Sequence, residues 1–169
     1  LTPAIVLGSR FIGEHDRLVD LYTKDLGRLL ARVVGGLKMN SKLSPHLDVG
    51  NFVDVRLVYK NQFTVTDVVS RARFRGASFL RDIFFVKSLL PEGSPDLRLW
   101  HDLMNGFKAG RVKMKNFLKI LGYDPLLAEC VGCGARQIAY FHPPDQSFLC
   151  SGCSQKFKIS KAKLLSLEF

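Results

Sequence analysis

The sequence predicts an α+β protein, in which a barrel of five β-strands is followed by a small helical domain with an embedded four-cysteine segment. Three observations carry this prediction. β-rich runs separated by turn signals occupy residues 4–75, apolar residues recur at helical spacing from residue 77, and all four cysteines form two C-x-x-C pairs between residues 130 and 153. The chain is therefore divided into a barrel domain, 1–76, and a helical domain, 77–169.

Five strands are expected in the first domain, at residues 4–11, 17–23, 28–34, 52–59 and 62–69. Alternation is clearest in the fourth, where Val53, Val55 and Leu57 share one face. Lys60 and Asn61 then form a turn signal, so the fourth and fifth strands are predicted to make a hairpin. Five short strands within about 70 residues favour a small closed barrel such as an OB-fold over a sandwich. An SH3-like barrel is the alternative.

Three helices are expected to follow, at about 77–90, 96–108 and 111–121, with a short fourth helix at 160–167. In the first, Phe79, Ile83 and Val86 recur at the spacing of one helix face. In the third, Met114 and Phe117 share an apolar face. The change from strand to helix periodicity after residue 76 places the domain boundary.

The chain is basic, with 25 Lys and Arg against 15 Asp and Glu and a net charge of +10. This charge is spread along the chain and does not form a detached tail. A positive field over a folded body favours polyanionic partners, and nucleic acid is the commonest soluble one. The alternative is that the charge serves only solubility.

The segment between the third and fourth strands, residues 35–45, is rich in Gly, Ser, Asn and Pro and is predicted to be a loop. It carries Lys38 and Lys42, and we call it the basic loop. Loops of this kind flank the groove of an OB-fold, so both lysines are candidates to contact nucleic-acid phosphates. Arg28 and Arg32, on the strand that leads into the loop, are further candidates. For each residue the alternative is a solvated surface charge.

Further candidates lie around the predicted hairpin of the fourth and fifth strands. Arg71, Arg73 and Arg75 alternate along the chain, so an extended backbone would project their guanidinium groups to one side. Tyr59 and Phe63 are able to stack on bases. We interpret these two as core residues, because large aromatic side chains are mostly buried.

Two other classes of function remain open. In one, the protein is a recruitment module that captures an acidic peptide through basic helices. Its surface would include Arg81 and a stripe along the third helix, where Arg111, Lys115 and Lys119 are spaced four residues apart. In the other, it is an RNA-binding protein that combines a barrel with a zinc ribbon.

The cysteines follow the pattern C-x2-C-x16-C-x2-C, at Cys130, Cys133, Cys150 and Cys153. This spacing is typical of a zinc ribbon or knuckle. Each pair can direct its thiolates to one ion at about 2.3 Å, and four thiolates leave no position for water. We therefore expect one structural Zn²⁺, a knuckle at residues 128–155, and a short hairpin at 140–145. The alternatives are redox-active or unmetallated pairs, or a metal site in which His142 replaces a cysteine.

No catalytic constellation is readable in the sequence. Glu14, His15 and Asp16 are consecutive, so they are poorly placed to converge on one proton and are interpreted as a polar turn. Glycine-rich phosphate loops and the motif of zinc deaminases do not occur. We expect neither an enzyme nor a small-molecule substrate.

The sequence is expected to belong to a cytoplasmic protein without a membrane span. Its longest uninterrupted aliphatic run, Ala4–Leu7, has four residues, whereas a spanning helix needs about 18. The first residues lack the basic, apolar and small-residue regions of a signal peptide. In the cytoplasm, paired cysteines favour metal binding over a disulfide framework.

Four landmarks occur in a characteristic order. They are GEHDRLV at Gly13–Val19, SKL at Ser41–Leu43, LPEG at Leu90–Gly93, and LGY at Leu121–Tyr123 ahead of the first cysteine pair. With these landmarks and the four-cysteine knuckle, the chain resembles the RecO family of bacterial recombination mediators over nearly its whole length.

The resemblance implies an N-terminal OB-fold, a helical domain with an embedded zinc knuckle, and a non-catalytic role in the bacterial cytoplasm at the nucleoid. It also implies binding of single- and double-stranded DNA, annealing of complementary strands, and loading of RecA together with RecR and single-stranded DNA-binding protein. Family members usually continue with further helices after the knuckle, whereas this sequence has one predicted helix there.

Overall fold

The computed structural model describes residues 1–74 and 76–167. It contains two compact units, Leu1–Val112 and a second that starts at Lys113. The first unit comprises the barrel and two helices, and the second contains the knuckle. The domain boundary expected after residue 76 lies between the last strand of the barrel and the first helix. As a domain boundary it stays a prediction.

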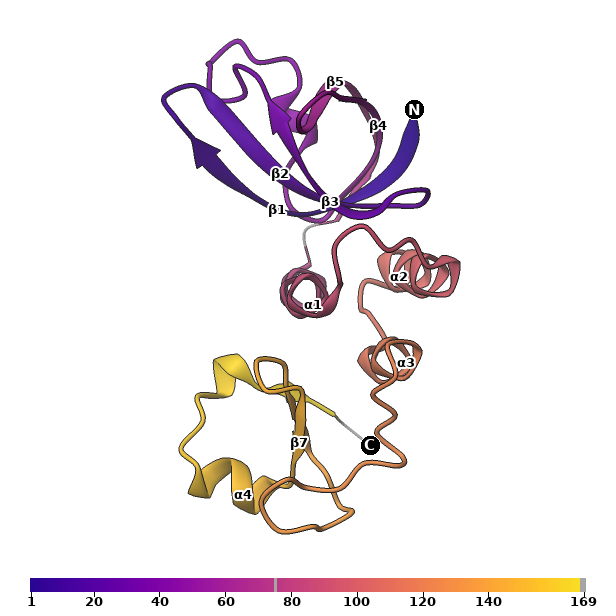
Figure 1. The fold of residues 1–169 in the computed structure, drawn as a ribbon, viewed down its shortest axis with the longest axis vertical. Helices are drawn as coiled ribbons and strands as arrows, with labels where there is room; N and C mark the ends of the chain where they lie inside the picture. The colour runs from indigo at the N-terminus through magenta and orange to yellow at the C-terminus, as the bar shows by residue number, and fades with distance from the viewer. Residues whose placement is uncertain (75, 168–169) are drawn as a thin grey trace. The chain divides into compact units, whose positions relative to one another are not determined.

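Five strands close into a barrel in the order β1-β2-β3-β5-β4 (Figure 1). They are β1 (Thr2–Ile12), β2 (Asp16–Thr23), β3 (Gly27–Val33), β4 (Asn51–Tyr59) and β5 (Phe63–Arg73). Neighbouring strands are antiparallel except β3 and β5, which pair in parallel where Ala31 faces Phe63. The closed barrel at the N-terminus, followed by helices, confirms the predicted fold class.

The barrel core follows from the alternation of side chains along each strand. In β3, Leu29, Ala31 and Val33 are buried and the residues between them are half-buried. The inward-facing residues and Leu47 form one cluster, which contains Ala4, Val6, Val19, Leu21, Leu29, Ala31, Val33, Leu47, Val53, Val55, Val65 and Val68. Burying one larger aliphatic side chain is worth about 1.5–3 kcal/mol, so this cluster is a main source of stability for the first unit.

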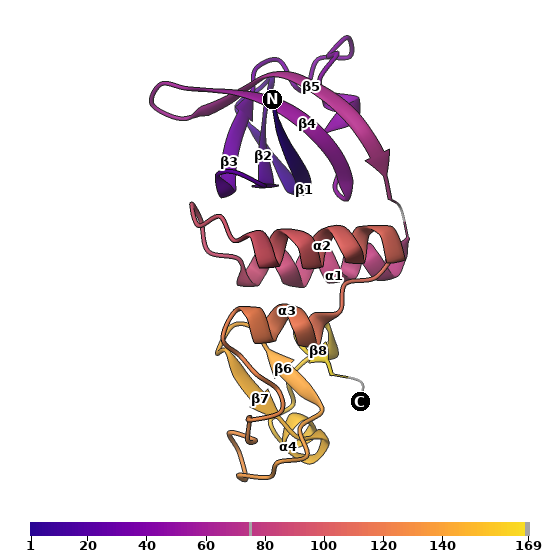
Figure 2. The ribbon, with the colours of Figure 1, turned by 90° about the vertical axis from the view of Figure 1, so that its right-hand side faces the viewer.

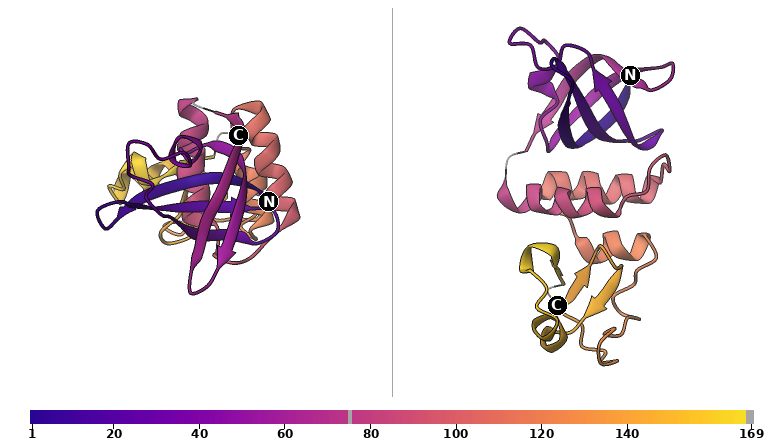
Figure 3. Two further views of the ribbon diagram at one scale, coloured as in Figure 1. Left: turned by 90° about the horizontal axis from the view of Figure 1, so that it is seen from above. Right: turned by 60° about the vertical axis from the view of Figure 1, so that its left-hand side comes forward.

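Helices α1 (Ala77–Leu89) and α2 (Leu97–Ala109) run side by side within the first unit (Figures 2 and 3). Phe79 of α1 meets Phe107 of α2 edge to face, with ring centroids 5.5 Å apart. Phe107 also contacts Phe52 of β4, at 5.9 Å between centroids. Aromatic side chains therefore join the two helices to the outer side of the barrel.

The second unit contains short elements only. They are α3 (Met114–Ile120), β6 (Tyr140–His142), β7 (Ser147–Leu149), α4 (Ser151–Lys156), the 3-10 turn η2 (Lys161–Lys163) and β8 (Leu165–Ser166). The sheet order is β7-β6-β8. The hairpin expected within the knuckle is formed by β6 and β7.

The third helix begins later than predicted, at Met114. The N–H of Val112 donates to the buried carboxylate of Asp82 at 2.8 Å, so this residue is held by α1 and does not start a helix. Arg111 therefore precedes α3. The predicted basic stripe along one helix is wrong in this respect, since only Lys115 and Lys119 lie on α3.

The predicted helix at 160–167 is also wrong. The segment contains the turn η2 and the strand β8, which pairs with β6 where Ser166 faces Tyr140. Burial alternates here, because Leu165 and Leu167 are buried and Ser166 is exposed. This alternation is the pattern of a strand, and the segment forms β8 although its leucines also have helical spacing. In the described part of the chain, no helix is both long enough and apolar enough to span a membrane.

Candidate functional site

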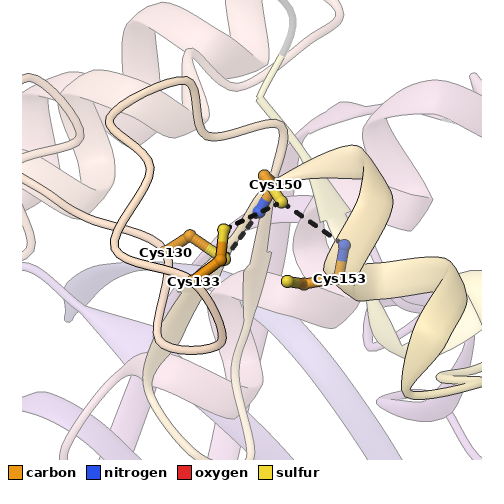
Figure 4. Close-up of side chains that lie close together, drawn as sticks. All are labelled: Cys130, Cys133, Cys150 and Cys153. Carbon is orange, nitrogen blue, oxygen red and sulfur yellow. Dashed lines mark hydrogen bonds between the residues drawn. The ribbon is translucent and has the colours of Figure 1, made fainter.

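The four cysteines come together in the second unit (Figure 4). The first pair lies in the segment before β6, Cys150 follows β7, and Cys153 lies in the first turn of α4. All four sulfur atoms lie within 4.8 Å of one another, and those of Cys133 and Cys150 are 3.7 Å apart. Tetrahedral Zn–S bonds of about 2.3 Å require sulfur atoms about 3.8 Å apart. The four thiols can therefore hold one metal ion.

Backbone N–H groups point at two of these sulfurs. The N–H of Cys150 donates to Cys130 Sγ and that of Cys153 donates to Cys150 Sγ, both at 3.3 Å. Burial acts to raise the pKa of Cys130, but backbone N–H groups, first that of Cys150, outweigh it and lower this pKa to about 6. Hydrogen bonding to Cys150 raises the pKa of Cys153 to about 12. These surroundings favour the thiolate of Cys130 and disfavour that of Cys153, whose negative charge a bound cation would stabilise.

The surroundings of the cluster fit an ion held by the cysteines alone. A Cβ on Gly132 would lie 2.8 Å from the sulfur of Cys153, so this close approach requires glycine. His142, the alternative ligand, lies with its Nδ1 2.9 Å from the carboxylate of Asp145. Among the described residues, the group able to hold a metal consists of the four cysteines.

The basic loop is fastened to the barrel at both ends. At its start, the N–H of Leu37 donates to the carbonyl of His15 at 2.9 Å. At its end, the guanidinium of Arg17 donates to the carbonyl oxygen of Ser44 at 3.3 Å and to that of Leu47 at 2.9 Å. The loop is therefore a defined surface feature of the barrel.

The two lysines of the basic loop, Lys38 and Lys42, are exposed. Between them Met39 is fully exposed, so the tip of the loop projects into solvent. No ion pair within the described ranges involves either lysine. Their ammonium groups are therefore accessible to an anionic ligand from solvent.

Arg32 lies at the base of the basic loop. Its guanidinium donates to Asp16 at 2.6 Å, and the same carboxylate accepts the N–H of Gly35 at 2.8 Å. The N–H of Gly35 and then Arg32 lower the pKa of Asp16. Glu14 and His15 lie in the turn between β1 and β2, as expected, whereas Asp16 is the first residue of β2. With 42% of its side chain exposed, Arg32 still presents a cationic edge to solvent.

Arg28 has a different environment. Its guanidinium donates to the buried carboxylate of Asp20 at 2.8 Å and to the carbonyl of Leu90 at 2.9 Å. Only 17% of its side chain is exposed. Arg28 therefore joins β2 and β3 to the end of α1, and its hydrogen bonds are directed into the protein.

The arginines after β4 lie on a strand that is longer than predicted. β5 extends to Arg73, which is exposed and faces Asn51 in the register. Arg71 occupies a β-bulge and donates to Asp54 at 2.6 Å. Arg75 lies outside the described residues. The structure therefore shows the positions of Arg71 and Arg73 within the predicted stripe.

Two hydrogen bonds join His46, just after the basic loop, to β4 and to this part of β5. The ring of His46 lies 2.8 Å from the hydroxyl of Ser70, and the side chain of Asn51 donates to the His46 carbonyl at 2.8 Å. Ser70 and Asn51 neighbour Arg71 and face Arg73, respectively. Two predicted sets of cations, on the basic loop and on β5, are therefore connected through one short segment of the barrel.

The helical cations are distributed over both units. Arg81 is exposed on α1, and Arg111 is exposed ahead of α3. On α3, Lys115 is half-buried and Lys119 lies 3.3 Å from the carboxylate of Asp124. Arg111 belongs to the first unit, and the two lysines belong to the second.

One aromatic residue differs from its interpretation in the sequence. Phe63 packs against the barrel core as expected, but Tyr59 is 64% exposed. The signal that distinguishes them is their position, because Tyr59 ends β4 at the tip of a hairpin whose alternation is interrupted by a bulge. Alternation alone placed Tyr59 on the core face.

Comparisons with known proteins agree with this architecture. The chain matches the family models described as Recombination protein O N terminal, over residues 1–73, and Recombination protein O C terminal, over residues 86–162. It is 30% identical to a protein named DNA repair protein RecO of Rubrobacter xylanophilus, over 88% of this chain and 69% of the relative.

Two more relatives of the same name show similar coverage. The protein of Thermoanaerobacter sp. is 28% identical over 92% of this chain and 71% of its own length. That of Dehalococcoides mccartyi is 30% identical over 90% of this chain and 69% of its own length. Both matched models and these relatives lead to one conclusion: the chain belongs to the RecO family of DNA repair proteins.

Proposed function

We propose that this chain binds single- and double-stranded DNA through phosphate contacts, anneals complementary strands, and acts with RecR and single-stranded DNA-binding protein in loading RecA. DNA contact is assigned to the barrel, and a structural role to the knuckle. No catalytic step is assigned to the chain, because a metal closed in by four thiolates offers no position for water or substrate. The DNA repair role of the family supports the proposal.

The observation that carries the proposal is the basic loop. Its ends are hydrogen-bonded to the barrel, while Lys38 and Lys42 extend into solvent without an ion pair among the described residues. Phosphate contact releases counterions and is the main source of affinity in sequence-independent binding. Ordered backbone with two exposed lysines suits this task, because little loop entropy is lost when DNA binds.

The proposed path continues onto the strands on either side of the loop. It consists of Arg32, Lys38, Lys42, Arg71 and Arg73, and the sequence adds Arg75. Arg32 and Arg71 each hold a carboxylate and would exchange part of that ion pair for phosphate. Arg28 is left out of the path, because its guanidinium is directed to Asp20 and Leu90.

Zinc is the metal we propose for the four cysteines. Thiolate ligands in a tetrahedral S4 set select Zn²⁺ or iron, and four sulfur atoms within 4.8 Å of one another suit a single ion. Such an ion would bind Cys130, Cys133, Cys150 and Cys153 and connect the two ends of the β6–β7 hairpin. Its contribution is to folding of residues 128–155.

The partner proteins are proposed from the family alone. Arg81 and Arg111 of the first unit, and Lys115 and Lys119 of the second, are further candidates for contact with such a partner or with DNA, each pair within its own unit. An acidic peptide that bound there, without any affinity of the chain for DNA, would support the recruitment alternative instead.

The proposed function is tested by the rate at which the protein anneals two complementary oligonucleotides, with and without single-stranded DNA-binding protein. We expect acceleration by the wild type and a clear loss in Lys38→Ala/Lys42→Ala. The matched control is Lys161→Ala/Lys163→Ala, which removes the same charge from two exposed lysines of the second unit. This control should anneal like the wild type.

Absence of annealing by folded, metal-loaded wild type contradicts the proposal. Equal losses in both double variants would assign the effect to net charge and not to the basic loop. Repeating the binding measurement with RNA of the same base sequence tests the RNA alternative, which predicts tighter binding of RNA than of DNA.

A further inference from the structure

We propose that Tyr59, supported by Phe63, is a stacking platform for one unpaired nucleobase of single-stranded DNA. The inference rests on the proposed DNA binding and adds to it a contact with a base, where the basic loop offers contacts with phosphates. It predicts that the hairpin tip distinguishes single strands from duplex.

The platform consists of two aromatic rings with different surroundings. Tyr59 is the last residue of β4 and Phe63 the first of β5, and they face each other in the register of the hairpin. Their ring centroids lie 4.9 Å apart, with an angle of 56° between the ring planes. Phe63 packs against the barrel core, whereas 64% of Tyr59 is exposed. One ring is thus anchored, and it holds the other in solvent.

An exposed, supported aromatic ring has a specific use in proteins that bind single strands. Stacking on an aromatic face is tolerant of base identity, because every base has a π-face. Core packing does not account for Tyr59, since most of its surface contacts no other residue. The loop between the fourth and fifth strands is also one of the two loops through which OB barrels bind oligonucleotides.

Cations flank the aromatic pair. Lys60 follows Tyr59 directly and is exposed, and Arg56 is exposed earlier on β4. On the other side, Arg32 faces Thr64 in the parallel pairing of β3 with β5, one residue beyond Phe63. Cationic residues therefore neighbour the aromatic pair along β4 and across the pairing of β3 with β5, and Arg56 faces Asp67 in the hairpin. The β4–β5 hairpin extends away from the rest of the barrel (Figure 2).

Duplex DNA cannot use this platform without disruption. Its bases are paired and stacked on one another, and removing one from the stack costs a few kcal/mol. A single strand has unpaired bases, so it gains the contact at little cost. The ring of Tyr59 should therefore raise affinity for single strands and leave affinity for duplex unchanged.

The test compares equilibrium binding of a single-stranded oligonucleotide, the matching duplex, and an abasic strand with the same number of phosphates. Tyr59→Ala is expected to weaken binding of the single strand by about 5-fold to 150-fold, which is the range expected when alanine replaces an aromatic residue that stacks on a base. Binding of the duplex and of the abasic strand should change less than twofold. Tyr59→Phe, which keeps the ring, should bind all three like the wild type.

A matched control separates stacking from a general loss of exposed aromatic surface. Phe84 on α1 is 63% exposed and meets the ring of Phe85 edge to face at 5.6 Å between centroids, so, like Tyr59, it is an exposed ring beside a second aromatic ring. Phe84→Ala should leave all three affinities unchanged. Circular dichroism and thermal unfolding establish that each variant is folded.

Several outcomes overturn the inference. They are an equal loss on single strand and abasic strand, an equal loss on duplex, or a loss in Tyr59→Phe as large as in Tyr59→Ala. If Tyr59→Ala has no effect while Lys38→Ala/Lys42→Ala weakens binding, the platform is wrong and the proposed function stands. If the folded wild type binds none of the three ligands, the proposed function itself fails.

Discussion

The barrel and the knuckle achieve their folds in different ways. The barrel has strands of up to 11 residues that close on themselves around twelve buried residues, so apolar packing and a closed hydrogen-bond ladder stabilise it together. The sheet of the second unit has strands of three, three and two residues. Its buried cluster around the site consists of Cys130, Leu149, Cys153 and Leu164, and half of these are cysteines.

This difference implies that apolar packing stabilises the barrel, whereas a bound metal stabilises the knuckle. A unit of about 60 residues buries only about 60% of the surface that its unfolded chain exposes, and a segment below about 40 residues, such as the knuckle, usually needs a metal or disulfides. Two of the four residues in the buried cluster at the site, Cys130 and Cys153, are proposed metal ligands. Stability of the knuckle should thus depend on the ion, and stability of the barrel should not.

The strongest way to break this comparison is to remove the metal. A chelator, or Cys133→Ser, is expected to unfold the knuckle, since structural zinc contributes about 10 kcal/mol or more of apparent binding energy. The single tryptophan, Trp100, packs against Tyr22 and Phe52 in the first unit, so its fluorescence should not change. Amide hydrogen exchange of the residues of the knuckle measures its unfolding.

The control for this experiment is Ser151→Ala, an exposed change beside Cys150 that leaves all four ligands in place. It should keep one zinc per chain by metal analysis. Well under one zinc per chain in wild type, with free thiols and an intact knuckle, contradicts the metal dependence. A shift of Trp100 emission on chelation would mean that the barrel also depends on the ion.

The converse change lies in the barrel core. Leu21→Ala removes a fully buried side chain and should lower the free energy of unfolding of the first unit by about 2–5 kcal/mol. Denaturant unfolding followed by Trp100 fluorescence measures this loss. Zinc content should remain at one per chain, and a parallel loss of zinc from folded protein would show that the two units are stabilised together.

A smaller effect is expected where the first unit ends. Asp82 is buried and accepts the N–H of Val112, so Asp82→Ala leaves that N–H without its acceptor and should cost about 1–3 kcal/mol. Asp82→Asn keeps an oxygen acceptor and avoids the buried charge. It should be at least as stable as the wild type at pH 7, as measured by urea unfolding.

The same residue has a pH dependence of known sign. Burial raises the pKa of Asp82 above its ordinary value of 3.8, against the opposing effect of the Val112 N–H. As pH rises from 3.8 through the raised pKa, the unfolded state releases its proton first, so this group's contribution to stability falls. The stability advantage of Asp82→Asn should therefore be larger at pH 7 than at pH 3. An advantage that is the same at both values contradicts the assignment.

Sequence patterns were sufficient where a local rule acts without competition. The alternation at Val53 and Val55 predicts an inward face, and paired cysteines at fixed spacing predict one cluster. They were insufficient where a contact with a residue far away in the sequence determines the local structure. Val112 leaves the predicted helix because Asp82, thirty residues away, accepts its N–H.

The same limit applies to the candidate DNA surface. Arg28 and Arg32 look alike in the sequence, but the former meets Asp20 and a carbonyl at the end of α1, and the latter stays partly exposed. Tyr59 follows the alternation of the core and is nevertheless exposed at the hairpin tip. Such differences depend on which elements cover which side of the barrel, and spacing along the chain carries no information about that.

The smallest expected change in stability accompanies the most direct test of DNA binding by the barrel. Lys38→Ala/Lys42→Ala should leave unfolding unchanged, because both side chains lie in solvent. Five phosphate contacts predict that the logarithm of the binding constant for a single strand falls with the logarithm of salt concentration with a slope of about −3.5. Removing two contacts should flatten that slope by about 1.4 and weaken two unrelated sequences equally, since phosphates carry no base identity.

The decisive measurement is therefore this slope, determined at several salt concentrations for wild type, for Lys38→Ala/Lys42→Ala and for the control Lys161→Ala/Lys163→Ala. The barrel assignment predicts a flatter slope in the first double variant and the wild-type slope in the control. Unchanged slopes in the loop variant, with full zinc content and intact fold, would contradict DNA binding by the basic loop and direct attention to the cations of the helices.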